Sequence, residues 1–90
     1  MRKIKLTRAN KSILLKALAP YYYQEREFGH STQEVGKLIL KINALPADKK
    51  ASFYAEEIFL MRSTINQLRN DQLAKGQYTD AADDILLKLF

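Results

Sequence analysis

The sequence predicts an all-α protein, a four-helix bundle made of two similar helical hairpins. Apolar residues recur at helical spacing in several segments, which is the pattern of helices with one buried face. The chain also resembles itself when it is shifted by 47 residues, so that residues 6–42 align with residues 53–89 without a gap. One helical hairpin cannot hide its apolar face, whereas two packed hairpins can. We therefore expect a single domain over residues 1–90.

The internal repeat rests on matched glycine, threonine and apolar positions. Gly29 aligns with Gly76, and Thr32 aligns with Thr79. Apolar residues of the first unit align in the same way with apolar residues of the second: Val35, Leu38, Ile39 and Ile42 with Ala82, Ile85, Leu86 and Leu89. Each unit is expected to contain a long helix, a glycine loop and a short helix.

The first unit opens with a helix that Thr7 or Asn10 can cap, because the side-chain oxygens of both residues can bind free amides of a first turn. Pro20 lacks a backbone donor, so this helix either ends near Ala19 or continues with a kink. Gly29 then ends the long helical segment of the first unit, since glycine readily adopts the left-handed conformation that ends many helices.

The short helix of the first unit is expected to reach about Ala44. Ser31 and Glu34 have the spacing of a capping box at its start. Residues 45–50 follow as a linker, because Pro46 stops the helix and the polar residues after it solvate a turn.

The second unit begins with a long helix expected over about 53–75, with Ser52 as its N-cap. Gly76 ends this helix as Gly29 ends the first. Thr79 then caps a last helix that runs through Leu89.

The predicted core consists of residues that share the apolar faces of these helices on a helical wheel. They are Leu14, Leu18, Leu38, Ile42, Met61, Ile65, Ile85 and Leu89. Because these positions come from all four helices, the prediction places one continuous core between the two hairpins.

Catalysis has little support in the sequence, and we expect no enzyme, no cofactor and no metal site. The chain has no cysteine, which excludes thiolate zinc ligands and thiol nucleophiles. Its one histidine, His30, follows Gly29 in a predicted loop. No apolar run approaches the roughly 18 residues that span a bilayer, and no signal peptide is evident. The expected location is the cytoplasm.

A non-enzymatic protein-binding or regulatory module, including a homodimer, is the first functional hypothesis. Phe59 lies opposite the apolar stripe of its helix, with Arg62 and Asn66 further along the same face. An aromatic residue with a polar surround is favoured at protein interfaces. Tyr22 and Tyr23 are expected at the surface near Pro20 and can join such an interface. Further apolar residues lie off the stripes: Leu15, Leu40 and Leu87.

Nucleic-acid binding by a basic N-terminal arm is the alternative hypothesis. Residues 1–50 carry a net charge of +7, whereas residues 51–90 carry −2. Residues 1–5 form either an extended or a flexible arm, and Arg2, Lys3, Lys5 and Arg8 are its candidate contacts with phosphates. No helix-turn-helix, zinc-finger or RNA-binding signature accompanies these residues.

The capped long helix, the glycine loop and the short helix that ends in Leu-Leu-Lys-Leu at 86–89 resemble small helical proteins encoded by phages and prophages of Gram-positive bacteria. This resemblance implies an accessory or regulatory binder. In size, charge and helix count, the chain also resembles bacteriocin immunity proteins, which are small helical bundles. That second resemblance implies action at the inner face of a membrane. Neither resemblance assigns a role to an individual residue.

Overall fold

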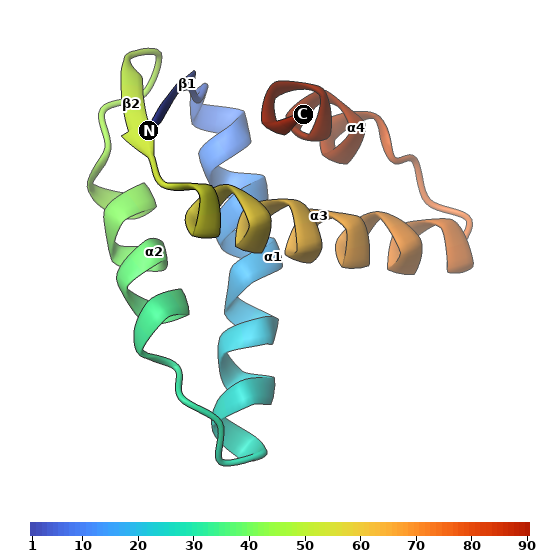
Figure 1. The fold of residues 1–90 in the computed structure, drawn as a ribbon. Coiled ribbons are helices and arrows are strands. Elements are labelled where there is room, and N and C mark those ends of the chain that lie inside the picture. The colour runs from blue at the N-terminus through green and yellow to red at the C-terminus, as the bar shows by residue number, and fades with distance from the viewer.

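The computed structural model describes all 90 residues and is mostly helical. The elements follow one another as β1 (Arg2–Lys5), α1 (Arg8–Glu27), α2 (Gln33–Ala44), β2 (Lys50–Phe53), α3 (Ala55–Ala74) and α4 (Asp80–Leu89) (Figure 1). The four predicted helices are confirmed. The expectation of an entirely helical fold is incomplete, because β1 and β2 form a small antiparallel sheet.

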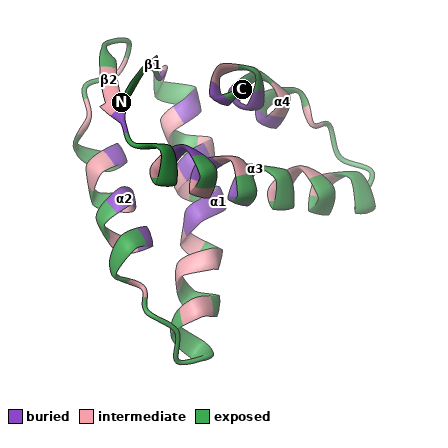
Figure 2. Cartoon of the chain, viewed as in Figure 1, coloured by how far each residue is buried: buried purple, intermediate pink, exposed green.

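The helices form two hairpins that meet near the two strands. In Figure 1, α1 runs away from the strands and α2 returns beside it, while α3 crosses α1 and α4 returns beside α3. Buried residues lie where the hairpins and the strands face one another, and the two loops at the hairpin tips are exposed (Figure 2). The strands therefore cover one end of the core, at the corner from which both hairpins extend.

The predicted core is confirmed at all eight positions. Each of them is at most 1% exposed: Leu14, Leu18, Leu38, Ile42, Met61, Ile65, Ile85 and Leu89. Phe53 is equally buried, but it lies at the end of β2 and not on a helix. The core is thus larger than the helix faces alone predict, since Ile4 and Phe53 of the strands and Leu6, which follows β1, also belong to it.

The basic arm has an extended conformation, since its residues 2–5 form strand β1. β1 pairs with β2 in an antiparallel register that places Arg2 opposite Phe53 and Lys5 opposite Lys50. The turn before β2 depends on Asp48, which has a φ of 64° and whose N–H donates to the carbonyl of Leu6 at 2.9 Å. The predicted linker is therefore partly a strand, because pairing with β1 satisfies backbone groups that a loop would leave to water.

The start of α3 differs from the prediction for the same reason. The helix begins at Ala55 and not near Phe53, and Tyr54 rather than Ser52 occupies the N-cap position. The backbone N–H of Tyr54 donates to the carboxylate of Glu57 at 2.8 Å, which satisfies an amide at the helix entrance. Ser52 cannot cap the helix because it belongs to the strand.

The first helix resolves two alternatives that the sequence leaves open. Thr7 and Asn10 act together at its start, each side chain accepting from the backbone N–H of the other at 3.0 Å. The helix continues through Pro20 to Glu27, with Pro20 exposed. The expected capping box of the next helix is not formed, because α2 begins after Thr32 and has no side-chain cap.

Corresponding elements of the two hairpins start at a constant spacing. The starts of α1 and α3, Arg8 and Ala55, are 47 residues apart, and those of α2 and α4, Gln33 and Asp80, are separated by the same number. Gly29 and Gly76 both have left-handed backbones, with φ of 77° and 68°. These positions follow the shift found in the sequence, while the repeat itself stays a prediction.

Candidate nucleic-acid interface

The two strands form a ribbon whose faces differ in chemistry. Side chains alternate across a strand, so Ile4 and Phe53 point into the core while Lys3 and Lys5 point outward. The register places Lys50 opposite Lys5, and it places Ser52 opposite Lys3. We call these four outward residues the ribbon face: Lys3, Lys5, Lys50 and Ser52. Three of its four positions therefore carry a positive charge.

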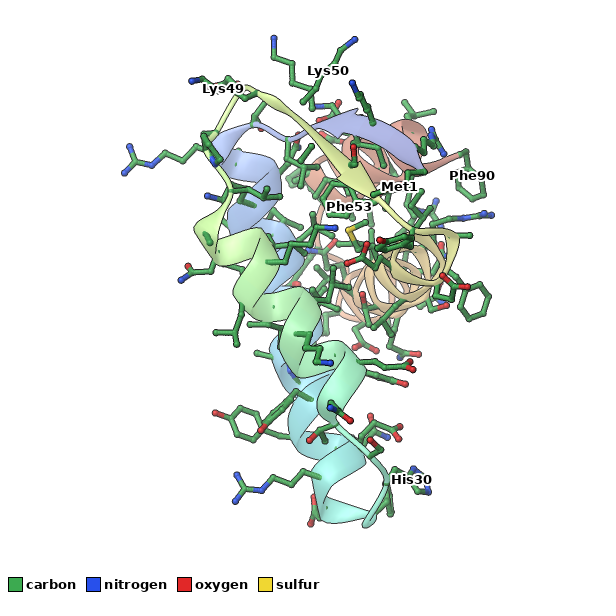
Figure 3. All side chains as sticks on the ribbon, turned by 60° about the vertical axis from the view of Figure 1, so that its left-hand side comes forward. Met1, His30, Lys49, Lys50, Phe53 and Phe90 are labelled. Carbon is green, nitrogen blue, oxygen red and sulfur yellow. The ribbon has the colours of Figure 1, made fainter.

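The lysines of the ribbon face have no acidic partner. The ion pairs of the structure join Glu25 with His30, Lys41 with Glu57 and Arg69 with Asp83. Lys5 lies directly opposite Lys50, and like charges in this arrangement destabilise a sheet. The labelled Lys49 and Lys50 extend from the ribbon away from the helices (Figure 3). An anion bound outside the ribbon would relieve this repulsion.

Two lysines of the helices hold the strands in place. The ammonium of Lys41 donates to the carbonyl of Ser52 at 2.7 Å and to the carboxylate of Glu57 at 2.9 Å. The ammonium of Lys88 donates to the carbonyl of Lys5 at 3.4 Å. These bonds tie each strand to the C-terminal part of a short helix. The ribbon face is consequently presented on a supported backbone.

The four predicted basic contacts do not all lie on the same surface. Lys3 and Lys5 are exposed on the ribbon face, and Arg8 is exposed at the first residue of α1 beside it. Arg2 points the other way, and its guanidinium donates to the carbonyls of Leu89 at 2.8 Å and Phe90 at 2.6 Å. Because Arg2 caps the C-terminus of α4, we do not include it in the interface.

Sequence reasoning missed Lys49 and Lys50 as members of this basic surface. Both lie in the polar run interpreted as a solvated linker. Their neighbours in space, Lys3 and Lys5, are more than 40 residues away along the chain. A signal for two strands is present in the sequence. Lysine alternates with apolar residues in Lys3-Ile4-Lys5, and lysine precedes an apolar residue in Lys50-Ala51.

The predicted protein-binding residues on α3 are placed at the surface. Phe59 is 70% exposed, and Asn66 is also exposed. Arg62 is engaged within the chain, since its guanidinium carbon lies 3.9 Å from the centre of the Phe90 ring. Of the other apolar residues expected outside the core, Leu40 and Leu87 are exposed, whereas Leu15 is half-buried against the core.

The predicted tyrosine contacts lie on the α1–α2 hairpin, in the part of α1 that is far from the ribbon. Tyr22 is half-buried, and a Cβ placed on Gly36 would lie 3.5 Å from its ring. Tyr23 is exposed and meets Tyr22 edge-on, with 5.4 Å between ring centres. With residues Ala19, Ile39 and Leu40, they line an apolar groove of about 340 Å³. The structure therefore does not bring these tyrosines together with the basic ribbon.

The α3–α4 hairpin has an ion pair where the first hairpin has this tyrosine contact. Arg69 and Asp83 lie 47 residues after Tyr22 and Gly36, and Arg69 Nε lies 2.5 Å from Asp83 Oδ1. Hydrogen bonds from the Thr79 hydroxyl, at 2.9 Å, and from Arg69 lower the pKa of Asp83 below its ordinary value. The pair joins the two helices of this hairpin at its surface.

The one histidine of the chain pairs with a single carboxylate. His30 Nδ1 lies 2.6 Å from Glu25 Oε2 in the loop between α1 and α2. No group of three histidine, cysteine, aspartate or glutamate side chains is arranged to hold a metal ion. None of the helices is both long enough and apolar enough to cross a membrane.

Comparison of the chain with known protein families, with curated proteins and with solved structures finds no match.

Proposed function

We propose that this protein binds double-stranded DNA by placing its two-stranded ribbon in the major groove. The observation that carries the proposal is the ribbon face, where Lys3, Lys5 and Lys50 occupy three of four outward positions without an acidic partner. Lysine side chains neutralise phosphates and donate to the acceptors of guanine. This role agrees with the regulatory binding that the resemblance to phage-encoded helical proteins implies.

The shape of the ribbon favours B-form DNA over other nucleic acids. Neighbouring strands lie about 4.8 Å apart, and the major groove of B-DNA, about 12 Å wide, admits a two-stranded ribbon. The major groove of A-form RNA is too deep and narrow for side chains to read. Proteins that bind single strands stack bases on aromatic rings, and the ribbon face carries none.

We also infer that the chain contains two copies of one unit, each made of a strand, a long helix and a short helix. The constant spacing of helix starts supports this, as do contacts at equivalent positions. Lys41 and Lys88, 47 residues apart, bind the carbonyls of Ser52 and Lys5, which are themselves 47 residues apart. Each short helix thus supports the strand of the other unit, as in an interlocked dimer.

The DNA-binding proposal is tested by fluorescence anisotropy with a labelled duplex of about 20 base pairs, two helical turns. Binding is compared with that of an RNA duplex and a single strand of the same sequence, over a range of salt concentrations. The test variant replaces Lys3, Lys5 and Lys50 by Gln. A matched control replaces three exposed lysines outside the ribbon by Gln: Lys16, Lys37 and Lys75. Both variants lose the same charge.

We expect the DNA duplex to bind most tightly and its affinity to fall with salt. If the three ribbon lysines contact phosphates, the test variant lowers the slope of log K against log salt by about 2 to 3. The control keeps a slope close to that of the original protein. Equal loss in both variants would show that net charge alone drives binding, and tighter binding to the single strand would reject the groove model.

Association with a protein through the outer face of α3 is a second candidate function, a second copy of the chain included. The observation that favours it is the 70% exposure of Phe59, a large aromatic side chain on a helix whose other face packs against the core. Analytical ultracentrifugation of the original protein and of Phe59→Ser tests self-association. A folded variant that dissociates supports the candidate, and a monomeric original protein excludes the homodimer.

A further inference from the structure

We propose that the protein binds its duplex in one preferred orientation, because a scaffold with approximate two-fold symmetry carries an asymmetric ribbon face. This inference rests on the proposed DNA binding. The inference compares the outward side chains that β1 contributes to the ribbon face with those that β2 contributes. On the ribbon face the difference lies at one pair of equivalent positions, Lys5 and Ser52, while beside the ribbon Arg8 is equivalent to Ala55 and Lys49 to Arg2.

The register of the ribbon is that of a two-fold axis. Ile4 pairs with Ala51, which lies 47 residues later, so these two equivalent residues face each other. On one side of this pair, Lys3 faces Ser52, which is the equivalent of Lys5. On the other side, Lys5 faces Lys50, which is the equivalent of Lys3. The axis therefore passes between Ile4 and Ala51, at the middle of the ribbon.

The contacts that support the ribbon follow the same axis. Lys41 reaches the carbonyl of Ser52 and the side chain of Glu57, the third residue of α3. Lys88 reaches the carbonyl of Lys5 and the side-chain oxygen of Asn10, the third residue of α1. Equivalent lysines thus brace equivalent carbonyls and equivalent first-turn residues. The two strand backbones are presented in the same way.

The side chains of the ribbon face break this symmetry at one pair of positions. Lys3 is equivalent to Lys50, so the axis relates a lysine to a lysine. Lys5 is equivalent to Ser52, so here the axis relates a long cationic side chain to a short hydroxyl side chain. One end of the ribbon therefore presents the facing lysines Lys5 and Lys50, and the other end presents Lys3 beside Ser52.

A DNA duplex has a backbone with local two-fold axes, so the scaffold can dock on a given site in two directions. In one docking direction a given base of the site faces Lys5, and in the other direction the same base faces Ser52. The identity of that base decides which direction is preferred. A lysine donates to O6 and N7 of guanine, whereas serine is tolerant of the base it meets. We expect an asymmetric site with guanine on the Lys5 side, bound in the preferred direction about tenfold more tightly than in the other.

Directed cleavage of DNA measures this orientation. The chain has no cysteine, so Ala9→Cys or Glu56→Cys introduces a unique attachment point for an iron chelate that cuts nearby DNA. The two positions are equivalent, exposed, and lie in the first turns of α1 and α3, on opposite sides of the ribbon axis. The probe is a set of duplexes selected by the original protein from a library with about 20 randomised base pairs, two helical turns.

On an asymmetric selected site, we expect the two variants to cut on opposite sides of the centre, each on one side. Equal cutting on both sides by each variant would overturn the preferred orientation while leaving DNA binding intact. If no duplex is selected, the proposed function itself fails. These results therefore separate the two proposals.

Two further substitutions make the ribbon face symmetric and test the cause. Ser52→Lys places lysine at both equivalent positions, and Lys5→Ser places serine at both. In either background the tethered chelate should cut the two sides of the site more evenly than it does in the original protein. Because Lys5 is exposed, Lys5→Ser remains informative if Ser52→Lys does not fold. One-sided cutting that is undiminished in these backgrounds would assign the orientation to other residues, such as Arg8, and reject the proposal.

Discussion

Phe53 joins the ribbon to the helical core, and its truncation should destabilise the whole domain. The side chain is 0% exposed, and the Lys41 ammonium lies 4.5 Å from the centre of its ring. Replacing a buried phenylalanine by alanine removes its burial and leaves a cavity, at a cost of about 3–5 kcal/mol. Domains of this size are stable by about 5–15 kcal/mol in total. Phe53→Ala should therefore remove a large part of the free energy of unfolding.

Urea denaturation followed by far-ultraviolet circular dichroism measures this loss. Phe59→Ala is the matched control, since Phe59 has the same side chain but is 70% exposed, and its truncation should change stability by less than about 0.5 kcal/mol. A loss below about 1 kcal/mol for Phe53→Ala would place Phe53 outside the core and detach the ribbon from it. Equal losses in the two variants would refute the burial argument as well.

Three other predictions concern the helices. Ile65→Ala, at a fully buried position of α3, should cost about 2–5 kcal/mol in urea denaturation, and a loss below about 0.5 kcal/mol would break the assignment of the α3 core face. Hydrogen bonds from Thr79 and Arg69 lower the pKa of Asp83, so the unfolded state binds the proton first and the free energy of unfolding should fall as pH drops below 3.8. Asp83→Asn should weaken this dependence. An unchanged profile of urea midpoint against pH in this variant would contradict the assignment. Arg2→Gln removes the side chain that binds the last carbonyls of α4, so amide hydrogen exchange should accelerate in its final turn and not in α2.

The helices could be predicted from the sequence because their signals are local. Apolar spacing within each segment locates the buried face, and it correctly placed residues as far apart as Leu14 and Leu89 in one core. Glycine at Gly29 and Gly76 also located the ends of the long helices, since both adopt the left-handed conformation. Such signals need no knowledge of which segments meet in space.

The ribbon could be predicted only in part because its pairing is not local. Lys3 and Lys5 were recognised as a basic arm, but each strand has only four residues and its partner lies in the other half of the chain. The pairing makes the end of the expected linker and the expected start of the third helix into β2, and it adds Lys50 to the basic surface. Arg2 was removed from it by a contact with the opposite end of the chain, which no local pattern indicates.

DNA binding through the ribbon is tested most directly by mapping where a duplex contacts the protein. Titration of the isotope-labelled protein with a duplex of about 20 base pairs, followed by amide chemical shifts in NMR spectra, gives this map residue by residue. DNA binding through the ribbon predicts that the largest shift changes fall in residues 2–5 and 49–53 and at the start of α1 around Arg8. Changes concentrated around Phe59 on α3 or around Tyr22 on α1, with the ribbon amides unchanged, would contradict it.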